Sequence, residues 1–169
     1  MPGPKGNLVK NPGFELGLQF WEIPVTLNDL TTRNVDIRDN VNAHSGNAAA
    51  ALGSNSSTDP AAIFQDVRVA ENRFYELHFH VAGTTLPPNA DLIVEARWLN
   101  KHKNDLGPGL NIFVPGGTIG NAGDGEWSPH ARLTSESPEH AAYARLSFTR
   151  GEGIANELVL DDVFFADQS

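Results

Sequence analysis

The sequence predicts an all-β fold: a single-domain, two-sheet antiparallel β-sandwich of the jelly-roll type. Three observations support this prediction. Short segments alternate apolar and polar residues, which is the period of a strand with one buried face. The 16 Gly and 11 Pro residues of the 169-residue chain fall between these segments rather than inside them. No long stretch keeps a 3.6-residue apolar period, so we expect helix only as a turn or two.

Ten segments have the alternation or the composition of strands. The three clearest are 74–82, 91–99 and 141–149, in which apolar residues at every second position oppose polar ones. In the first of them, positions 77, 79 and 81 are apolar, and the polar alternates are Glu76, His78 and His80. In chain order, the expected strands are 21–26, 32–37, Ala48–Leu52, 62–69, 74–82, 91–99, 111–114, 127–133, 141–149 and 157–166, of which the first two are the weakest.

Three segments rich in Gly and Pro, 87–90, 105–109 and 115–125, are expected to be surface loops. Strands resume in the same style after each of them, so none is typical of a linker between domains. We therefore expect one sandwich domain over residues 7–167, preceded by a disordered leader at residues 1–6.

Composition excludes several classes of function. The chain has 12 Lys and Arg against 21 Asp and Glu, a net charge of −9 that would repel a phosphate backbone, so nucleic acid is not an expected partner. It has no Cys, which excludes thiolate nucleophiles and cysteine-ligated zinc, so any metal must be held by oxygen or imidazole. Its longest apolar runs are far shorter than the ~20 residues of a membrane span, so we expect no membrane insertion.

Several short motifs occur in a fixed order along nearly the whole chain. They are 7–15 (NLVKNPGFE) followed by Trp21, 44–49 (HSGNAA), 63–67 (IFQDV), 75–77 (YEL), 97–100 (RWLN) and 160–163 (LDDV). Together they resemble the motifs of bacterial carbohydrate-binding modules of families 4/9 and 22, which belong to the galactose-binding-like jelly-roll superfamily.

This resemblance implies a non-catalytic module that recognises a polysaccharide or oligosaccharide on the concave face of one sheet. It also implies an extracellular or cell-surface location and a larger parent protein that carries a catalytic or surface domain. The alternative is a structural or assembly module on a cell, spore or phage surface that uses the same fold for protein contact.

The resemblance further implies a structural calcium ion where the first and last strands meet. Calcium takes six to eight oxygen ligands, and Glu15 with Asp161 or Asp162 can supply carboxylates, while the turn at Asn47 can lend backbone carbonyls. Two adjacent Asp in an apolar strand put one of them on the buried face, where an unpaired carboxylate is costly. The alternative is that Arg, Lys or backbone amides at a turn satisfy these acids.

The polar alternates of the three clearest strands are expected to share one sheet face and to bind the ligand. Planar groups stack on the C–H faces of sugars, and forked donors and acceptors bind pairs of hydroxyls. The expected ligand residues are Gln65, His78, His80, Glu95, Arg97, Tyr143 and Arg145, with Trp127 as a further contact after the glycine-rich loop. The alternative is a solvated face with cross-strand ion pairs worth only ~0.2–1 kcal/mol each, and edge packing for Trp127.

Enzymatic function has little support in the sequence. The chain contains no nucleophile elbow and no phosphate-binding loop. His78 and His80 could ligate zinc or copper, with Glu76 or Glu95 as the third ligand, and this is the basis of a less favoured alternative, a small metal-dependent hydrolase.

Overall fold

The computed structural model describes residues 6–24, 35–39, 43–85 and 88–169. These residues form nine strands and two short 3₁₀ helices. The elements are β1 (Val35–Asp39), β2 (Ala48–Leu52), β3 (Ala61–Arg68), β4 (Tyr75–Gly83), β5 (Leu92–Leu99), β6 (Asp105–Val114), η2 (Gly116–Thr118), η3 (Ala122–Asp124), β7 (Ser128–Leu133), β8 (Tyr143–Arg150) and β9 (Leu158–Asp167). None of the described helices has the length and apolar character needed to span a membrane.

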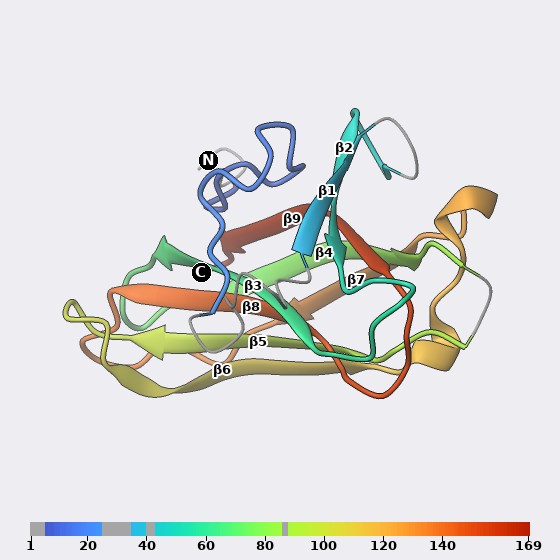
Figure 1. Ribbon diagram of the computed structural model, residues 1–169. Helices are drawn as coiled ribbons and strands as arrows, with labels where there is room; N and C mark the ends of the chain where they lie inside the picture. Colours follow the sequence, from blue (N-terminus) through green and yellow to red (C-terminus); the bar gives the residue numbers. More distant parts are fainter. Residues whose placement is uncertain (1–5, 25–34, 40–42, 86–87) are drawn as a thin grey trace.

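The strands form two antiparallel sheets packed as two layers (Figure 1). The five-stranded sheet has the order β1-β2-β9-β4-β7, and the four-stranded sheet has the order β3-β8-β5-β6, seen as the lower layer in Figure 1. The prediction of a two-sheet β-sandwich is confirmed.

The core lies between the sheets and is built from the apolar alternates of the strands. Leu77, Phe79 and Val81 of β4 are fully buried, as are Leu146 and Phe148 of β8. The strand period therefore identified the buried side chains correctly.

An N-terminal segment, residues 7–22, joins the two sheets. The backbone N–H of Leu8 donates to the carbonyl of Phe165 in β9 at 2.8 Å. Further along, Glu22 and Phe64 of β3 exchange two backbone hydrogen bonds of 2.9 and 2.8 Å. Trp21 is buried between these two anchors. The segment thus spans from β9 in one sheet to β3 in the other.

Element boundaries differ from the expectation at β6. Residues 105–109, expected to be a loop, form the first half of β6 because the pairing with β5 contains two register shifts, and because the missing N–H of Pro108 is tolerated in an edge strand. Residues 1–5 of the expected leader, residue 87 of the first expected loop, and parts of the expected strands 21–26 and 32–37 lie outside the described residues.

Replacing the core tryptophan should strongly destabilise the fold. Trp98 is 1% exposed, and its ring packs so closely on Gly109 that a Cβ at that glycine would lie 2.6 Å from it. We expect Trp98→Ala to lower the free energy of unfolding by roughly 3–5 kcal/mol, measured by urea denaturation. Phe113→Ala, at a side chain 59% exposed on β6, is the control and should cost far less. Equal losses in the two variants would contradict the assignment of the buried faces.

A half-buried histidine should make stability depend on pH. Burial, followed by the nearby positive charge of Arg132, lowers the pKa of His130, whose ring stacks on Phe79 with a centroid distance of 5.0 Å. Because the unfolded chain binds this proton more readily, the contribution of His130 to stability is complete above about pH 6.5 and is lost as the pH falls below it. His130→Gln should therefore lose less stability than wild type between pH 7 and pH 5. Parallel pH profiles from urea denaturation would contradict this.

Candidate functional site

The outer face of the four-stranded sheet brings together four of the residues expected to bind ligand. In the register of β5 and β8, Arg97 lies opposite Arg145 and Leu99 lies opposite Tyr143. Glu95, two residues before Arg97 on the same strand, points to the same face. The expectation that these side chains share a surface is confirmed.

The two arginines on this face are each held by an acid. Arg145 donates from Nε and Nη2 to the two carboxylate oxygens of Asp66 at 2.8 and 2.9 Å, and Lys103 Nζ lies 3.1 Å from the same carboxylate. Arg97 Nε donates to Asp105 at 2.8 Å, and its Nη1 lies 3.8 Å from Glu95. These acids offset the repulsion between two guanidinium groups that face one another across the strands.

The carboxyl of Asp66 is the most buried member of this network. Burial alone would raise the pKa of Asp66, but hydrogen bonds from Arg145 and Lys103 outweigh that effect and hold the pKa below its ordinary value. Asp66 therefore stays ionised at neutral pH and keeps both cations in fixed orientations.

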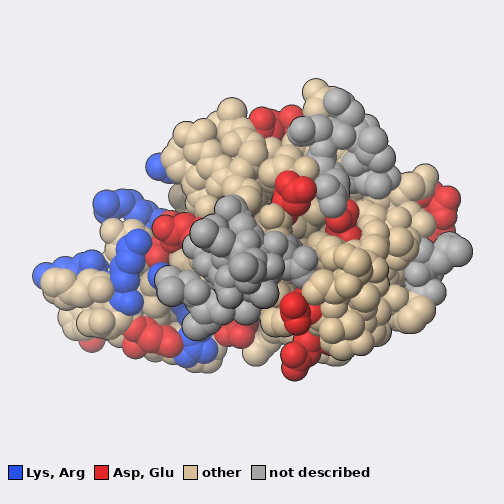
Figure 2. Space-filling view, viewed as in Figure 1, with Lys and Arg blue, Asp and Glu red and all other residues tan. Residues whose placement is uncertain are grey.

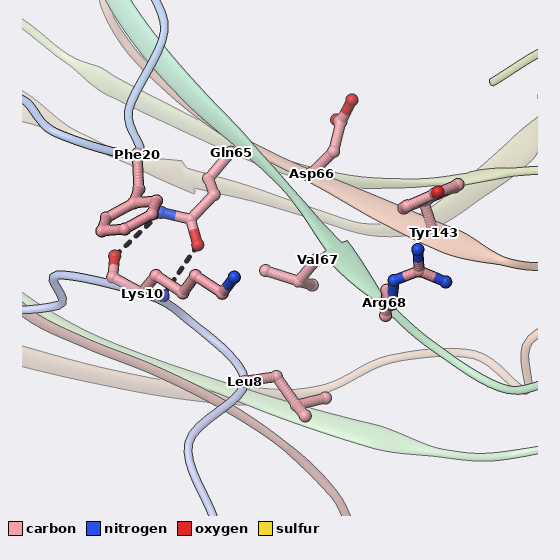
Figure 3. Close-up of a pocket in the computed structure, with 8 residues that line it drawn as sticks. All are labelled: Leu8, Lys10, Phe20, Gln65, Asp66, Val67, Arg68 and Tyr143. Atoms are coloured by element: carbon pink, nitrogen blue, oxygen red, sulfur yellow. Dashed lines mark hydrogen bonds between the residues drawn. The ribbon is translucent and has the colours of Figure 1, made fainter.

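A pocket of about 370 Å³ opens where β3 ends, next to this network (Figure 3). Phe20 and Lys10 of the N-terminal segment form one wall, and Tyr143 and Arg68 lie on the other side. The remaining lining residues are Leu8, Gln65, Asp66 and Val67.

Each wall of the pocket pairs an aromatic ring with a cation. Lys10 Nζ lies 5.4 Å from the centroid of Phe20, which is 47% exposed, and the guanidinium of Arg68 lies 5.6 Å from the centroid of Tyr143. Neither Lys10 nor Arg68 forms an ion pair with an acid in the part of the chain that the structure describes. The net charge of the chain is −9. Nevertheless, Figure 2 shows Lys and Arg gathered on the left of the view, where β3 ends in Figure 1.

Gln65 does not project to the outer face as expected. It lies in phase with the buried Ile63 and Val67 and is 5% exposed. Its side chain accepts from the backbone N–H of Lys10 at 2.8 Å and donates to the carbonyl of the same residue at 2.9 Å (Figure 3). A polar side chain can occupy an apolar position here because a distant backbone satisfies it. Gln65 fixes the wall of the pocket.

His78 and His80 do not share a face with the arginines. Both lie on β4, which belongs to the five-stranded sheet, so they project from the opposite side of the sandwich. Alternation identifies the buried side of a strand but does not say to which sheet the strand belongs. His78 Nε2 lies 2.9 Å from Glu76, whereas the ring of His80 stacks on His44.

Trp127 also lies away from the pocket. It packs against a small apolar cluster on the outer face of the five-stranded sheet, formed by Ala49, Ala51, Ala82, Ala122 and Val159. Its ring meets His44 edge to face, with a centroid distance of 5.6 Å. Both observations favour the packing interpretation of this tryptophan.

The three carboxylates expected at the calcium site lie together around the turn at residues 44–48. Oδ2 of Asp161, which is fully buried, accepts from the backbone N–H groups of His44 and Ser45 at 2.9 and 3.1 Å. Glu15 Oε1 accepts from the N–H groups of Asn47 and Ala48 at 2.8 and 3.2 Å. Backbone amides at the turn thus satisfy much of the negative charge of Asp161 and Glu15, as expected in the absence of a calcium ion.

The donor set at this turn is nonetheless chemically suited to a hard cation. A Cβ atom at Gly13 would lie 3.8 Å from Oδ1 of Asp161, 3.8 Å from Oδ1 of Asp162 and 3.9 Å from Cγ of Glu15. The side chains of all three acids therefore approach the same glycine. Burial raises the pKa of Asp161 to about 6, and no Lys or Arg among the described residues pairs with it. A bound calcium ion would favour the ionised form of this carboxyl.

Sequence reasoning missed Phe20 and Lys10 as pocket residues. Phe20 adjoins Trp21 in the N-terminal motif, and one of two neighbouring aromatic residues in a turn is often exposed. Their placement beside Tyr143 depends on how the N-terminal segment crosses β3, which no local pattern reports.

Solved structures with a similar fold include single binding modules. TmCBM61, solved in complex with β-1,4-galactotriose, matches over 96% of this chain and 99% of its own, with a TM-score of 0.66 and 19% identity. The CBM22-1 xylan-binding domain of Paenibacillus barcinonensis Xyn10C matches over 99% of this chain and 97% of its own, with a TM-score of 0.64 and 14% identity. The fold is that of a carbohydrate-binding module.

The same fold also occurs inside larger proteins. The enzymatically active domain of bacteriophage CBA120 tailspike protein 4 matches over 95% of this chain, with a TM-score of 0.73 and 18% identity, and this chain spans 21% of that domain. No protein-family model and no curated protein sequence matches the chain. The jelly-roll resemblance drawn from the short motifs is confirmed at the level of fold.

Proposed function

We propose that this chain is a non-catalytic module that binds an oligosaccharide or polysaccharide in the pocket beside β3 and along the adjoining outer face of the four-stranded sheet. The observation that carries the proposal is the pair of aromatic rings, Phe20 and Tyr143, on the two walls of one pocket. Sugar rings present C–H faces to such aromatic side chains, and the fixed guanidinium of Arg145 can hydrogen-bond to neighbouring hydroxyls.

The comparisons support a saccharide as the class of ligand. TmCBM61 was solved with β-1,4-galactotriose, and the CBM22-1 domain of Xyn10C is described as xylan-binding. Both match this chain over nearly its whole length.

Two cations at the pocket that pair with no acid among the described residues favour a saccharide that carries negative charge. Lys10 and Arg68 line the pocket from opposite sides, and the acids nearby are already engaged, as Asp66 is with Arg145 and Lys103. A carboxylate or sulfate on the sugar could form an ion pair with each of them. Among known sugar types, we therefore expect uronic-acid or sulfated oligosaccharides to bind best.

The acids at the pocket support a binding role rather than hydrolysis. Glycosidases require two carboxylates across the scissile bond. Asp66 is the only carboxylate among the described residues that line the pocket, and its oxygens are occupied by Arg145 and Lys103.

The setting of the chain is a further part of the proposal. Several proteins with this fold carry it as one segment of a larger chain, among them a Clostridium thermocellum xylanase with joined CBM22-1 and GH10 modules and the phage tailspike. We propose an extracellular or surface-exposed module of a larger protein. Assembly by protein contact is the alternative, and it would be favoured by a stable oligomer without glycan binding.

Removing the aromatic walls should weaken saccharide binding. We expect Phe20→Ala and Tyr143→Ala each to lower affinity about fivefold, since one stacking contact is worth on the order of 1 kcal/mol. The measurement is calorimetry with the oligosaccharide selected on a glycan array, on variants with unchanged melting temperature. Phe113→Ala is the matched control, because Phe113 is exposed on the same face but on the far edge strand β6.

Comparing charged with neutral sugars tests the expected charge preference independently of the location of the site. Lys10→Ala should weaken binding of an oligogalacturonide and leave a neutral galacto-oligosaccharide unaffected. A preference for neutral sugars would contradict the expected preference for negatively charged saccharides, but it would not contradict the location of the site. Full affinity in both aromatic variants would overturn the pocket as the site.

We also propose a structural calcium ion held by Glu15, Asp161 and Asp162, with carbonyls of the turn at Asn47. An ion that binds only the folded state raises stability by roughly 2.7 kcal/mol at a hundredfold excess over its Kd. We expect EDTA to lower the melting temperature of wild type and calcium to restore it, and neither to act on Glu15→Gln. Asp124→Asn, at an exposed residue of η3, should behave as wild type. An EDTA-insensitive wild type would contradict the proposal.

A further inference from the structure

Two histidines and an aspartate meet on the outer face of the five-stranded sheet, remote from the saccharide pocket. The β4–β9 pairing contains a register shift between His78 and His80, and Asp162 adopts a positive φ of 51° at this bulge. The bulge turns Asp162 toward the turn that carries His44. Bulges commonly redirect a side chain in this way.

The three side chains are close enough to share an ion. His44 Nδ1 lies 2.6 Å from Asp162 Oδ2, and the rings of His44 and His80 stack with a centroid distance of 3.8 Å. One ligand atom from each of the three residues lies within 4.8 Å of the others. His80 Nδ1 is buried and has no hydrogen-bond partner in the described part of the chain.

We propose that His44, His80 and Asp162 form a binding site for a divalent transition-metal ion such as zinc or copper. Two imidazole nitrogens and one carboxylate oxygen are a donor set that these ions prefer. The site differs from the proposed calcium site in its two imidazole donors. Asp162 belongs to both, because its Oδ2 faces His44 while its Oδ1 approaches Gly13 beside Asp161 and Glu15. The site also differs from the His78 and His80 pair expected from the sequence, because His78 is paired with Glu76.

Neighbouring groups hold the proposed ligands in place. The hydroxyl of Ser45 donates to Asp162 Oδ1 at 2.6 Å, which orients the carboxylate so that Oδ2 faces His44. The rings of Trp127 and His44 meet edge to face with a centroid distance of 5.6 Å. Partners of this kind typically tighten metal binding by fixing ligand orientation.

Trp127 makes the site directly measurable. The other two tryptophans, Trp21 and Trp98, are buried in the core between the sheets. Copper(II) bound beside His44 should quench the fluorescence of Trp127 in a saturable, one-to-one titration of the untagged protein in calcium-containing buffer. Zinc should compete with the copper.

Matched variants test the assignment. His44→Gln and His80→Gln should each weaken copper binding about tenfold or more, and Trp127→Phe should abolish the quenching while calorimetry still detects binding. His102→Gln, in the β5–β6 loop, should bind as wild type. The proposal would be overturned if copper did not bind at millimolar concentration, or if His44→Gln and His80→Gln, both with wild-type melting temperature, kept full affinity.

Discussion

Two carboxylates hold the turn at residues 44–48 by accepting hydrogen bonds from four of its backbone amides. Glu15 comes from the N-terminal segment and Asp161 from β9, so this one turn ties both ends of the chain to β2. Hydrogen bonds to an ionised acceptor are stronger than neutral ones, and they offset the cost of burying Asp161. Gly46 is required in the turn, because its φ is +59° and a Cβ there would collide with Glu15.

Both candidate sites depend on this arrangement. The N-terminal segment, once fixed at Glu15, carries Lys10 and Phe20 to β3, where Gln65 holds the backbone of Lys10. The wall of the saccharide pocket therefore exists only while this segment is docked. At the same turn, the bulge in the β4–β9 pairing directs Asp162 toward His44. Asp162 is therefore common to the two proposed metal sites.

Sequence patterns could predict the strands, the buried faces and the gathering of Glu15 with Asp161, because these follow from the strand period and from motifs near the two ends of the chain. They could not assign His78 and His80 to the correct sheet, since both outer faces of a sandwich show the same alternation. Gln65 was misplaced because its partner is the backbone of Lys10, 55 residues away. The contact between His44 and His80 depends on a turn docking against a bulge, which leaves no local pattern.

The most direct test of the saccharide site is a nitrogen-15 NMR titration of the labelled protein with an oligogalacturonide, followed by mapping of the amide shifts. We expect the largest saturable shifts at Lys10, Phe20, Arg68 and Tyr143, around the pocket beside β3. Shifts centred on His80 and Trp127, on the opposite sheet, would contradict this expectation.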